Sequence, residues 1–268
     1  MTENEILLTS ILDCSRASLY TERISLNRRQ SEKLSQALSL RAKGLPLQYI
    51  LGETEFFGLK FKVDSRVLIP RPETEILVET VIKQSPVLGL QSAVEILELG
   101  AGSGCIAVSL AKFLPQAKIT AVDISSDALS AAKENALLNG IEGRINFVQS
   151  NLFSSPELSG RSYGLIVSNP PYIPADDIKG LQREISYEPR IALDGGSDGL
   201  DFYRRIIVEA AQFLKNDGLL IMEIGYKQLP EIKNIFDKTG SFEIIGVVKD
   251  YNNIDRVIIG HLKAKKYG

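Results

Sequence analysis

The fold of this 268-residue chain is decided by one stretch of sequence, Val94-Glu-Ile-Leu-Glu-Leu-Gly-Ala-Gly-Ser-Gly-Cys-Ile-Ala107. Its apolar first half is typical of a buried strand, and its second half is typical of the start of a helix. Between them, Gly100, Gly102 and Gly104 permit a tight turn and let a ligand approach the backbone. The spacing is G-x-G-x-G and not the G-x-G-x-x-G of dinucleotide-binding turns, which disfavours a nicotinamide dehydrogenase.

A second predicted strand ends in a carboxylate about 20 residues beyond the glycines. This strand is Lys118-Ile-Thr-Ala-Val-Asp123, and an acidic residue in that place accepts hydrogen bonds from ribose hydroxyls. The succession of strand, glycine turn, helix, strand and Asp123 therefore predicts a site for an adenosine-type cofactor. The alternative is that Asp123 caps a helix that begins near Ser126, and one carboxylate could serve both purposes.

Strand-like and helix-like segments alternate through the rest of the chain. Strands are predicted near 94–99, 118–123, 145–149, 163–168, 218–224, 242–248 and 255–261, and helices near 73–84, 104–113, 126–139, 198–215 and 227–238. Such alternation predicts an α/β fold, with a parallel sheet and helices on both faces. The last two strands have no clear helix between them, so we expect them to form an antiparallel hairpin.

The beginning of the chain has a different pattern. Residues 5–43 carry helical periodicity, and Gly44 ends this region. The segment Glu55-Phe-Phe-Gly-Leu-Lys-Phe-Lys-Val63 alternates apolar and polar residues around a glycine, as in a short hairpin. We therefore expect a small N-terminal helical domain (1–44), a linker with a β-hairpin (45–72) and a Rossmann-like domain (73–268).

Composition disfavours several classes of protein. With 44% hydrophobic residues, 24% charged residues and a net charge of −2, neither disorder nor a large phosphate-binding surface is indicated. No apolar run reaches the ~18 residues that span a bilayer, and the acidic start Met-Thr-Glu-Asn-Glu is unlike a signal peptide, so we expect a cytoplasmic protein. Cys14 and Cys105 lack the spacing of a zinc site. The single histidine, His261, is interpreted as a strand residue, which leaves little for a Ser-His-Asp arrangement.

A stiff polar loop, Asn169-Pro-Pro-Tyr172, follows the strand predicted near 163–168. Because proline ends both strands and helices, the loop should lie at the carboxyl end of that strand, where open α/β sheets bind their ligands. The Asn169 amide and the Pro170 carbonyl offer two acceptor oxygens, and Tyr172 offers a flat aromatic face. Such a loop suits a planar NH2 group. The alternative is that the prolines only stop the strand and Tyr172 covers its end.

Several motifs resemble those of known methyltransferases. Glu98-Leu-Gly-Ala-Gly-Ser-Gly104 is similar to the first motif of S-adenosylmethionine-dependent methyltransferases, and Asn169-Pro-Pro-Tyr172 to that of enzymes that methylate planar amino groups. Further motifs resemble the HemK family, the N5-glutamine methyltransferases of peptide chain release factors: Ile69-Pro-Arg-Pro-Glu-Thr-Glu75, Tyr187-Glu-Pro189 and Asp250-Tyr-Asn-Asn-Ile-Asp-Arg-Val257. The match, from about residue 45 to the end, implies a Rossmann-like class I methyltransferase sheet with an N-terminal helical domain for substrate recognition.

The resemblance implies roles for the residues that match. The glycine turn would wrap the methionine part of S-adenosylmethionine, and Asp123 would bind its ribose. Asn151 stands where the family often has an acidic residue close to adenine, and its uncharged amide leaves that contact open. The implied cofactor-binding residues are Gly100, Ala101, Gly102, Ser103, Gly104, Asp123, Asn151, Leu152 and Asn169, without a metal. The implied substrate-binding residues are Asn169, Pro170, Pro171 and Tyr172, with Asn169, Pro170 and Tyr172 also catalytic.

The implied activity is methyl transfer to the glutamine side chain of the Gly-Gly-Gln motif in release factors, in support of translation termination. We expect a monomer whose partners are release factors, without direct contact to nucleic acid or membrane. The alternative is a DNA adenine-N6 or ribosomal RNA guanine-N2 methyltransferase, although such enzymes bind phosphates through a basic surface. A catalytically silent adaptor has no physical need for the complete set of motifs.

Two charged segments allow more than one interpretation. Arg71, Glu73 and Glu75 either line a substrate entrance or are charges that favour the start of a helix. Tyr187-Glu-Pro-Arg190 stands in a long segment after the tetrapeptide, where a substrate-gating lid is expected.

Overall fold

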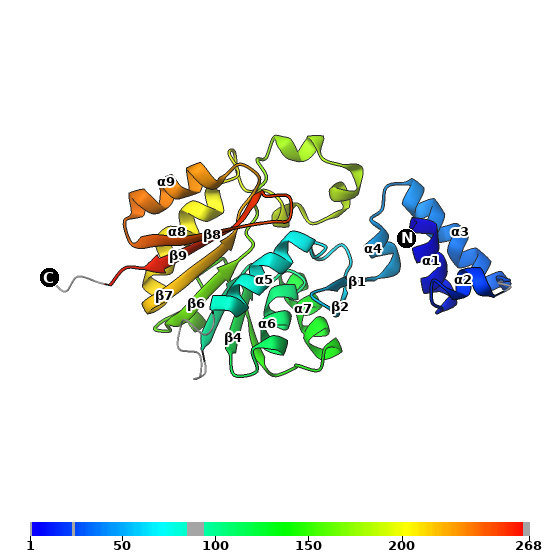
Figure 1. Ribbon diagram of the computed structural model, residues 1–268, viewed down its shortest axis with the longest axis horizontal. Helices are drawn as coiled ribbons and strands as arrows, with labels where there is room; N and C mark the ends of the chain where they lie inside the picture. Colours follow the sequence, from blue (N-terminus) through cyan, green and yellow to red (C-terminus); the bar gives the residue numbers. More distant parts are fainter. Residues whose placement is uncertain (1, 23–24, 85–93, 265–268) are drawn as a thin grey trace.

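A computed structural model describes residues 2–22, 25–84 and 94–264. A seven-stranded sheet forms the body of the molecule, and the N-terminal helices stand apart from it at one end (Figure 1). The strands of this sheet are β3 (Glu95–Leu99), β4 (Lys118–Asp123), β5 (Ile145–Gln149), β6 (Tyr163–Ser168), β7 (Leu214–Glu223), β8 (Phe242–Lys249) and β9 (Asp255–Leu262). Each overlaps a strand that the sequence predicts.

The strand order is β5-β4-β3-β6-β7-β9-β8. Strands β3 to β7 pair in parallel, while β9 lies antiparallel between β7 and β8. The predicted α/β class with an antiparallel end is therefore confirmed. The chain winds outward from β3 to β5 and then returns to the other side of β3 as β6, so the order reverses between β3 and β6. The carboxyl ends of parallel strands at such a switch point are where open α/β sheets bind ligands.

Helices cover both faces of the sheet. Alternate strand residues point to opposite faces, and in β3 Ile96 packs with one hydrophobic cluster while Leu97 and Leu99 pack with the other. The first cluster includes residues of α5 (Pro72–Gln84), α6 (Cys105–Phe113) and α7 (Ser126–Leu138), and the second includes residues of α8 (Asp201–Phe213) and α9 (Leu229–Thr239).

Two predicted boundaries need correction. Strand β7 begins at Leu214 and not near residue 218, so the preceding helix ends at Phe213 and not at residue 215. Helix α8 begins at Asp201 and not at the predicted residue 198. Gly199 has a φ of +75°, a left-handed conformation that is incompatible with an α-helix. The chain therefore turns before this helix starts.

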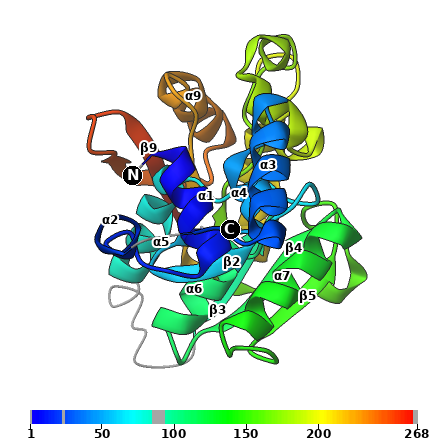
Figure 2. The same ribbon diagram turned by 90° about the vertical axis from the view of Figure 1, so that its right-hand side faces the viewer.

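The N-terminal part consists of short helices followed by a hairpin. Its elements are α1 (Glu3–Leu12), α2 (Ser18–Thr21), α3 (Arg28–Ala42), α4 (Leu47–Leu51), β1 (Glu53–Phe56) and β2 (Leu59–Lys62). Helices α1 and α3 lie side by side (Figure 2), and residues 23–24 of the predicted helical region lie outside the described residues. The hairpin turns at Phe57-Gly58, where both φ angles are positive as in a type I′ turn.

The long segment between β6 and α8 reaches the N-terminal helices (Figure 1). It contains three short 3₁₀ helices, at Asp177–Gly180, Arg183–Tyr187 and Arg190–Ala192. A guanidinium nitrogen of Arg41 in α3 lies 2.7 Å from a carboxylate oxygen of Glu184, and the Tyr187 hydroxyl donates to the carbonyl oxygen of Lys43 at 2.8 Å. This segment therefore joins the N-terminal helices to the loop that begins at Asn169. Across the described ranges, no helix combines the length and apolarity needed to cross a membrane.

Candidate active site

A cavity of about 230 Å³ lies at the carboxyl ends of β3, β4 and β6. Its walls come from the glycine turn, the loop after β6 and two segments far apart in sequence, 66–74 and 189–192. The predicted site residues that line it are Gly100, Ala101, Gly102, Ser103, Asp123, Asn151, Leu152, Asn169, Pro170 and Pro171. Gly104 and Tyr172 are not among its lining residues. Folding thus brings together most, but not all, of the predicted site.

The three glycines of the turn have different surroundings. Their φ angles are +79°, +53° and +78° for Gly100, Gly102 and Gly104, so all three need the freedom of glycine. A Cβ on Gly102 would meet nothing within 4 Å, whereas a Cβ on Gly104 would lie 2.9 Å from the Cβ of Ala132 in α7. The open space at Gly102 is available to a ligand. Gly104, which we expected at the cofactor, instead allows α6 and α7 to pack closely.

The Asp123 carboxylate joins the glycine turn to the start of α7. Its Oδ2 accepts from the Gly102 N–H at 2.8 Å, and its Oδ1 accepts from the Ser125 N–H at 2.9 Å. Burial raises the pKa of Asp123, and these backbone donors oppose that shift. The helix cap is Ser125, whose side chain accepts from the Ala128 N–H, so the interpretation of Asp123 as the cap is wrong.

The loop after β5 forms another part of the cavity wall. Leu152 is buried with a φ of +54°, an uncommon conformation for a residue other than glycine. Asn151 Oδ1 accepts a hydrogen bond from the Arg205 guanidinium at 3.0 Å. The amide oxygen that the sequence offers to adenine therefore already has one donor.

Side chains from other parts of the chain hold the loop after β6 in place. Asn169 Nδ2 donates to Thr74 Oγ1 at 3.0 Å, while Asn169 Oδ1 and the Pro170 carbonyl oxygen accept no hydrogen bond from the described residues. The Tyr172 hydroxyl donates to Glu223 Oε1 at 3.3 Å, at the end of β7. The loop thus offers two free acceptors beside the cavity, and its tyrosine is directed toward a buried carboxylate.

The charges near the start of α5 have separate partners. Arg71 lines the cavity and pairs with Glu188 at 2.6 Å, and Glu188 also accepts from the Ile69 N–H at 3.3 Å. Glu75 accepts from the Phe57 N–H at 2.7 Å, which holds the hairpin turn, and Glu73 lies 3.9 Å from Arg256. Arg71 therefore belongs to the site, whereas Glu73 and Glu75 make structural contacts.

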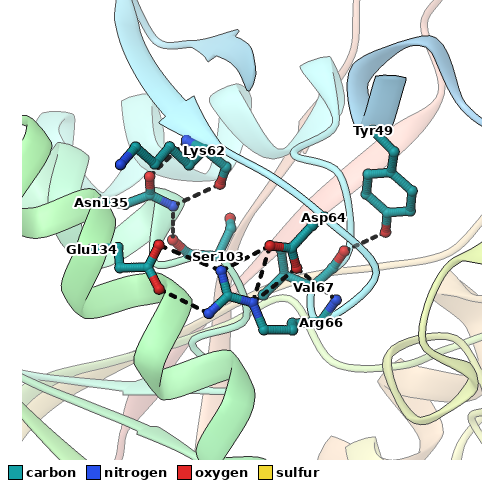
Figure 3. A network of polar contacts seen from close by, with 8 residues as sticks. All are labelled: Tyr49, Lys62, Asp64, Arg66, Val67, Ser103, Glu134 and Asn135. Carbon is teal, nitrogen blue, oxygen red and sulfur yellow. Dashed lines mark hydrogen bonds and ion pairs between the residues drawn. The ribbon is translucent and has the colours of Figure 1, made fainter. Parts of the chain in front are cut away.

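A polar network ties the linker to the glycine turn (Figure 3). The buried Asn135 of α7 bonds both backbone groups of Lys62 and donates to the carbonyl oxygen of Ser103 at 2.9 Å. Next to it, Arg66 lies between Asp64 and Glu134, with a shortest distance of 2.8 Å to each (Figure 3). The hairpin linker is therefore fixed on α7 beside the cavity.

The residues present fit a cationic cofactor such as S-adenosylmethionine. Glu98, immediately before the turn, is fully buried, and neither of its carboxyl oxygens makes a hydrogen bond within the described chain, although the Ala107 N–H faces it. Burial raises the pKa of Glu98 well above its usual range, and a nearby cation would favour the ionised form. Open space at Gly102 leaves room for the ligand. No group of three or more metal-ligating side chains occurs in the described ranges.

Three contributing residues were missed by the sequence analysis: Thr74, Glu188 and Glu223. Glu188 lay within a motif that supported the family resemblance and that we interpreted as part of a lid, without a role at the site. Glu223 did carry a signal, because a carboxylate inside the apolar run Leu219–Ile224 is costly unless it has partners. Its partners lie 51 and 149 residues away, so the sequence could not identify them.

Comparisons with known proteins agree with this site. The family model "Methyltransferase small domain" matches residues 72–186, and "PrmC N-terminal domain" matches residues 2–52. The chain is 43% identical to the release factor glutamine methyltransferase of Geobacter sulfurreducens, over 97% of this chain and 89% of that one. It is 42% identical to the enzyme of the same name from Thermodesulfovibrio yellowstonii, over 96% of this chain and 91% of that one.

Solved structures share the fold at lower identity. The ribosomal protein L11 methylase of Lactobacillus delbrueckii subsp. bulgaricus has a TM-score of 0.54 at 24% identity, covering 75% of this chain and 84% of that one. The hMettl16 catalytic domain has a TM-score of 0.61 at 18% identity, covering 92% and 87%. These two likenesses support the class I methyltransferase fold. The relatives that match along almost the whole sequence show that the chain belongs to the release factor glutamine methyltransferase family.

Proposed function

We propose that this enzyme transfers a methyl group from S-adenosylmethionine to the side-chain amide nitrogen of a glutamine in peptide chain release factors. The observation that carries the proposal is the orientation of the Asn169 amide. Its nitrogen donates to Thr74, and neither its oxygen nor the Pro170 carbonyl oxygen accepts a hydrogen bond within the described residues, although both residues line the cavity. Two fixed acceptors match the two hydrogens of a planar NH2 group.

The task of the acceptor loop follows from the chemistry of an amide. An amide nitrogen is a poor nucleophile because its lone pair is delocalised into the carbonyl group. When bound, S-adenosylmethionine supplies an electrophilic methyl group on a positively charged sulfur. Asn169 Oδ1 and the Pro170 oxygen hold the two N–H groups of the substrate and so orient the nitrogen for transfer. They also stabilise the positive charge that develops on that nitrogen. The neutral methylated amide then forms when the nitrogen releases one of its two protons to water.

Tyr172 has a different role from the one we expected. We expected Tyr172 to bind the substrate through its flat aromatic face, but its hydroxyl bonds Glu223 and it does not line the cavity. We propose that its contact with Glu223 holds the loop in shape. Any stacking on the substrate would then come from a movement on binding.

The cofactor is proposed to occupy the half of the cavity beside the glycine turn. Gly100 to Ser103 would contact the methionine part, and Asp123 the ribose. Leu152 and Asn151 would border the adenine, with Asn151 offering its NH2 group because its oxygen already bonds Arg205. Glu98, buried beside the turn, would supply negative charge there once the bound cation favours its ionised form.

The N-terminal helices are proposed to recognise the release factor. They contact the segment 183–188, which also pairs with Arg71 at the cavity. A protein bound to these helices could therefore present a glutamine at the loop after β6. We propose that the enzyme acts as a monomer in the cytoplasm. Its three parts are the N-terminal helical domain (1–44), the linker (45–72) and the Rossmann-like domain (73–268).

A labelled-methyl assay tests the proposal. The purified enzyme is offered a release factor, the same factor with its Gly-Gly-Gln glutamine replaced, and plasmid DNA. We expect label on the unaltered factor alone. Label on DNA alone, or equal label on both factors, would overturn it.

A further inference from the structure

A buried carboxylate lies behind the acceptor loop. Glu223, the last residue of β7, has no exposed surface. Its Oε2 accepts from the Thr74 hydroxyl at 2.7 Å, and its Oε1 accepts from the Tyr172 hydroxyl at 3.3 Å. Glu223 does not line the cavity, so it acts on the substrate only through these neighbours.

The direction of these hydrogen bonds determines which end of Asn169 faces the cavity. A threonine hydroxyl has one proton, and Thr74 donates it to Glu223. Thr74 Oγ1 can then only accept, and it accepts from Asn169 Nδ2 at 3.0 Å. The amide nitrogen is thereby engaged by Thr74, and the oxygen is left for the substrate.

Protonation of Glu223 would remove this constraint. A neutral carboxyl group can donate to Thr74 Oγ1, which frees the Thr74 proton for Asn169 Oδ1. The amide would then turn over and present its NH2 group to the cavity. A substrate NH2 group would meet a donor where it needs an acceptor.

The surroundings of Glu223 bring this change close to neutral pH. Burial, with a small contribution from the charge of Glu73 on α5, raises the pKa of Glu223 to about 7. The hydroxyls of Thr74 and Tyr172 and the charge of Arg256 on β9 lower it. From α8, Tyr203 donates its hydroxyl to the Glu223 carbonyl oxygen at 3.0 Å.

We propose that Glu223 and Thr74 are positioning residues, which hold the Asn169 side chain with its oxygen toward the substrate. The proposal rests on the proposed function in one respect, that Asn169 accepts a hydrogen from the substrate NH2 group. It goes beyond that function by making an ionised Glu223 a requirement for turnover.

The kinetic test is the pH dependence of kcat for the wild type, Glu223→Gln, Thr74→Val and Thr74→Ser. Wild-type kcat should fall about tenfold per pH unit below pH 7, because one ionised group is required. Glu223→Gln cannot titrate, so the ratio of wild-type to variant kcat should decrease as the pH falls. Thr74→Val should lower kcat and abolish its decrease below pH 7. Thr74→Ser, which keeps the hydroxyl, should restore both the rate and the pH dependence of the wild type.

A matched control is Thr80→Val on the same helix. Thr80 is also buried, but within the described part of the chain its hydroxyl donates to the carbonyl oxygen of Ile76 and makes no hydrogen bond with Glu223 or Asn169. Its pH profile should equal that of the wild type. Binding of S-adenosylhomocysteine, measured by calorimetry, should be unchanged in Thr74→Val, which shows that the cofactor half is intact.

A nuclear magnetic resonance titration tests the inference without any substrate. The side-chain amide signal of Asn169, identified by its absence in Asn169→Ala, should shift with a midpoint near pH 7 in the wild type and not in Glu223→Gln. An amide signal with the same titration in both proteins would overturn the inference, as would identical kinetic profiles. Failure to label a release factor would instead overturn the proposed function, and this titration would still decide the role of Glu223.

Discussion

The two halves of the site are built from different kinds of contact. The glycine turn is held mainly by backbone groups, with the N–H groups of Gly100 and Ala101 bonded to the carbonyl oxygen of Val122 on the neighbouring strand. The acceptor loop is held by side chains, since Asn169 bonds Thr74, 95 residues away, and Tyr172 bonds Glu223, 51 residues away. The glycine turn depends on backbone conformations that glycine can adopt. The acceptor loop depends on single side-chain atoms that come from distant parts of the chain.

The largest expected effect is a loss of kcat that leaves cofactor binding almost unchanged, which would separate the acceptor loop from the glycine turn. Asn169→Ala should lower kcat by about 10² to 10³-fold, because it removes an acceptor aimed at the developing charge. Affinity for S-adenosylhomocysteine should fall far less, since the glycine turn is unchanged. The labelled-methyl assay and calorimetry measure the two quantities. Asn146→Ala, at an exposed residue of β5, is the control, and turnover near wild type in Asn169→Ala would contradict the assignment.

Ionisation of Glu223, behind the acceptor loop, should also lower the free energy of unfolding at neutral pH and above. The pKa of Glu223 in the folded protein is about 7, above its ordinary 4.5. Below pH 4.5 the carboxyl group is protonated in both the folded and the unfolded state, and the folded state has its full stability. This stability is lost as the pH rises through 7, because the unfolded state ionises more readily than the folded state. At pH 8 this loss is on the order of 3 kcal/mol. Urea unfolding at pH 8 should show Glu223→Gln as more stable than the wild type, and the difference should shrink toward pH 5. A difference that is independent of pH would contradict this expectation.

Two substitutions in the turn distinguish packing from ligand binding. Gly104→Ala should lower the free energy of unfolding by about 2–3 kcal/mol, because its Cβ would lie 2.9 Å from Ala132 and its φ is +78°. Gly102→Ala should cost only about 1 kcal/mol, from its positive φ alone. Cofactor affinity should fall more in Gly102→Ala, where the space is open. Urea unfolding and calorimetry on both variants provide the measurement, and the opposite ranking would show that the glycine roles are reversed.

The smallest expected effect concerns the carboxylate of the cofactor half. Asp123→Asn should weaken cofactor binding about tenfold, because an amide keeps one acceptor oxygen but loses the charge-assisted bonds. At saturating cofactor, kcat should stay close to wild type. Asp127→Asn, at an exposed residue of α7, is the matched control for the calorimetry. A loss of kcat as large as that of Asn169→Ala would show that the two halves are not separable.

Much of the fold could be predicted because its signals are local. Strands β3, β4 and β6 are short apolar runs, and their periods and lengths are visible in the sequence. The glycine turn and Asp123 could be placed together because the βαβ connection fixes their distance along the chain. The roles within the turn could not be separated, since only the packing of α7 shows that Gly104 faces Ala132.

The sequence by itself determined the α/β class, the cofactor turn and the loop with two acceptor oxygens, because each is written in contiguous residues. Only the tertiary structure decided how that loop is oriented. Thr74 and Glu223 reach it from a helix and a strand that are 149 residues apart, and no local pattern records such a contact. The direction of a hydrogen bond depends on which of the two groups carries the proton. It is therefore defined only after folding has brought the two groups together.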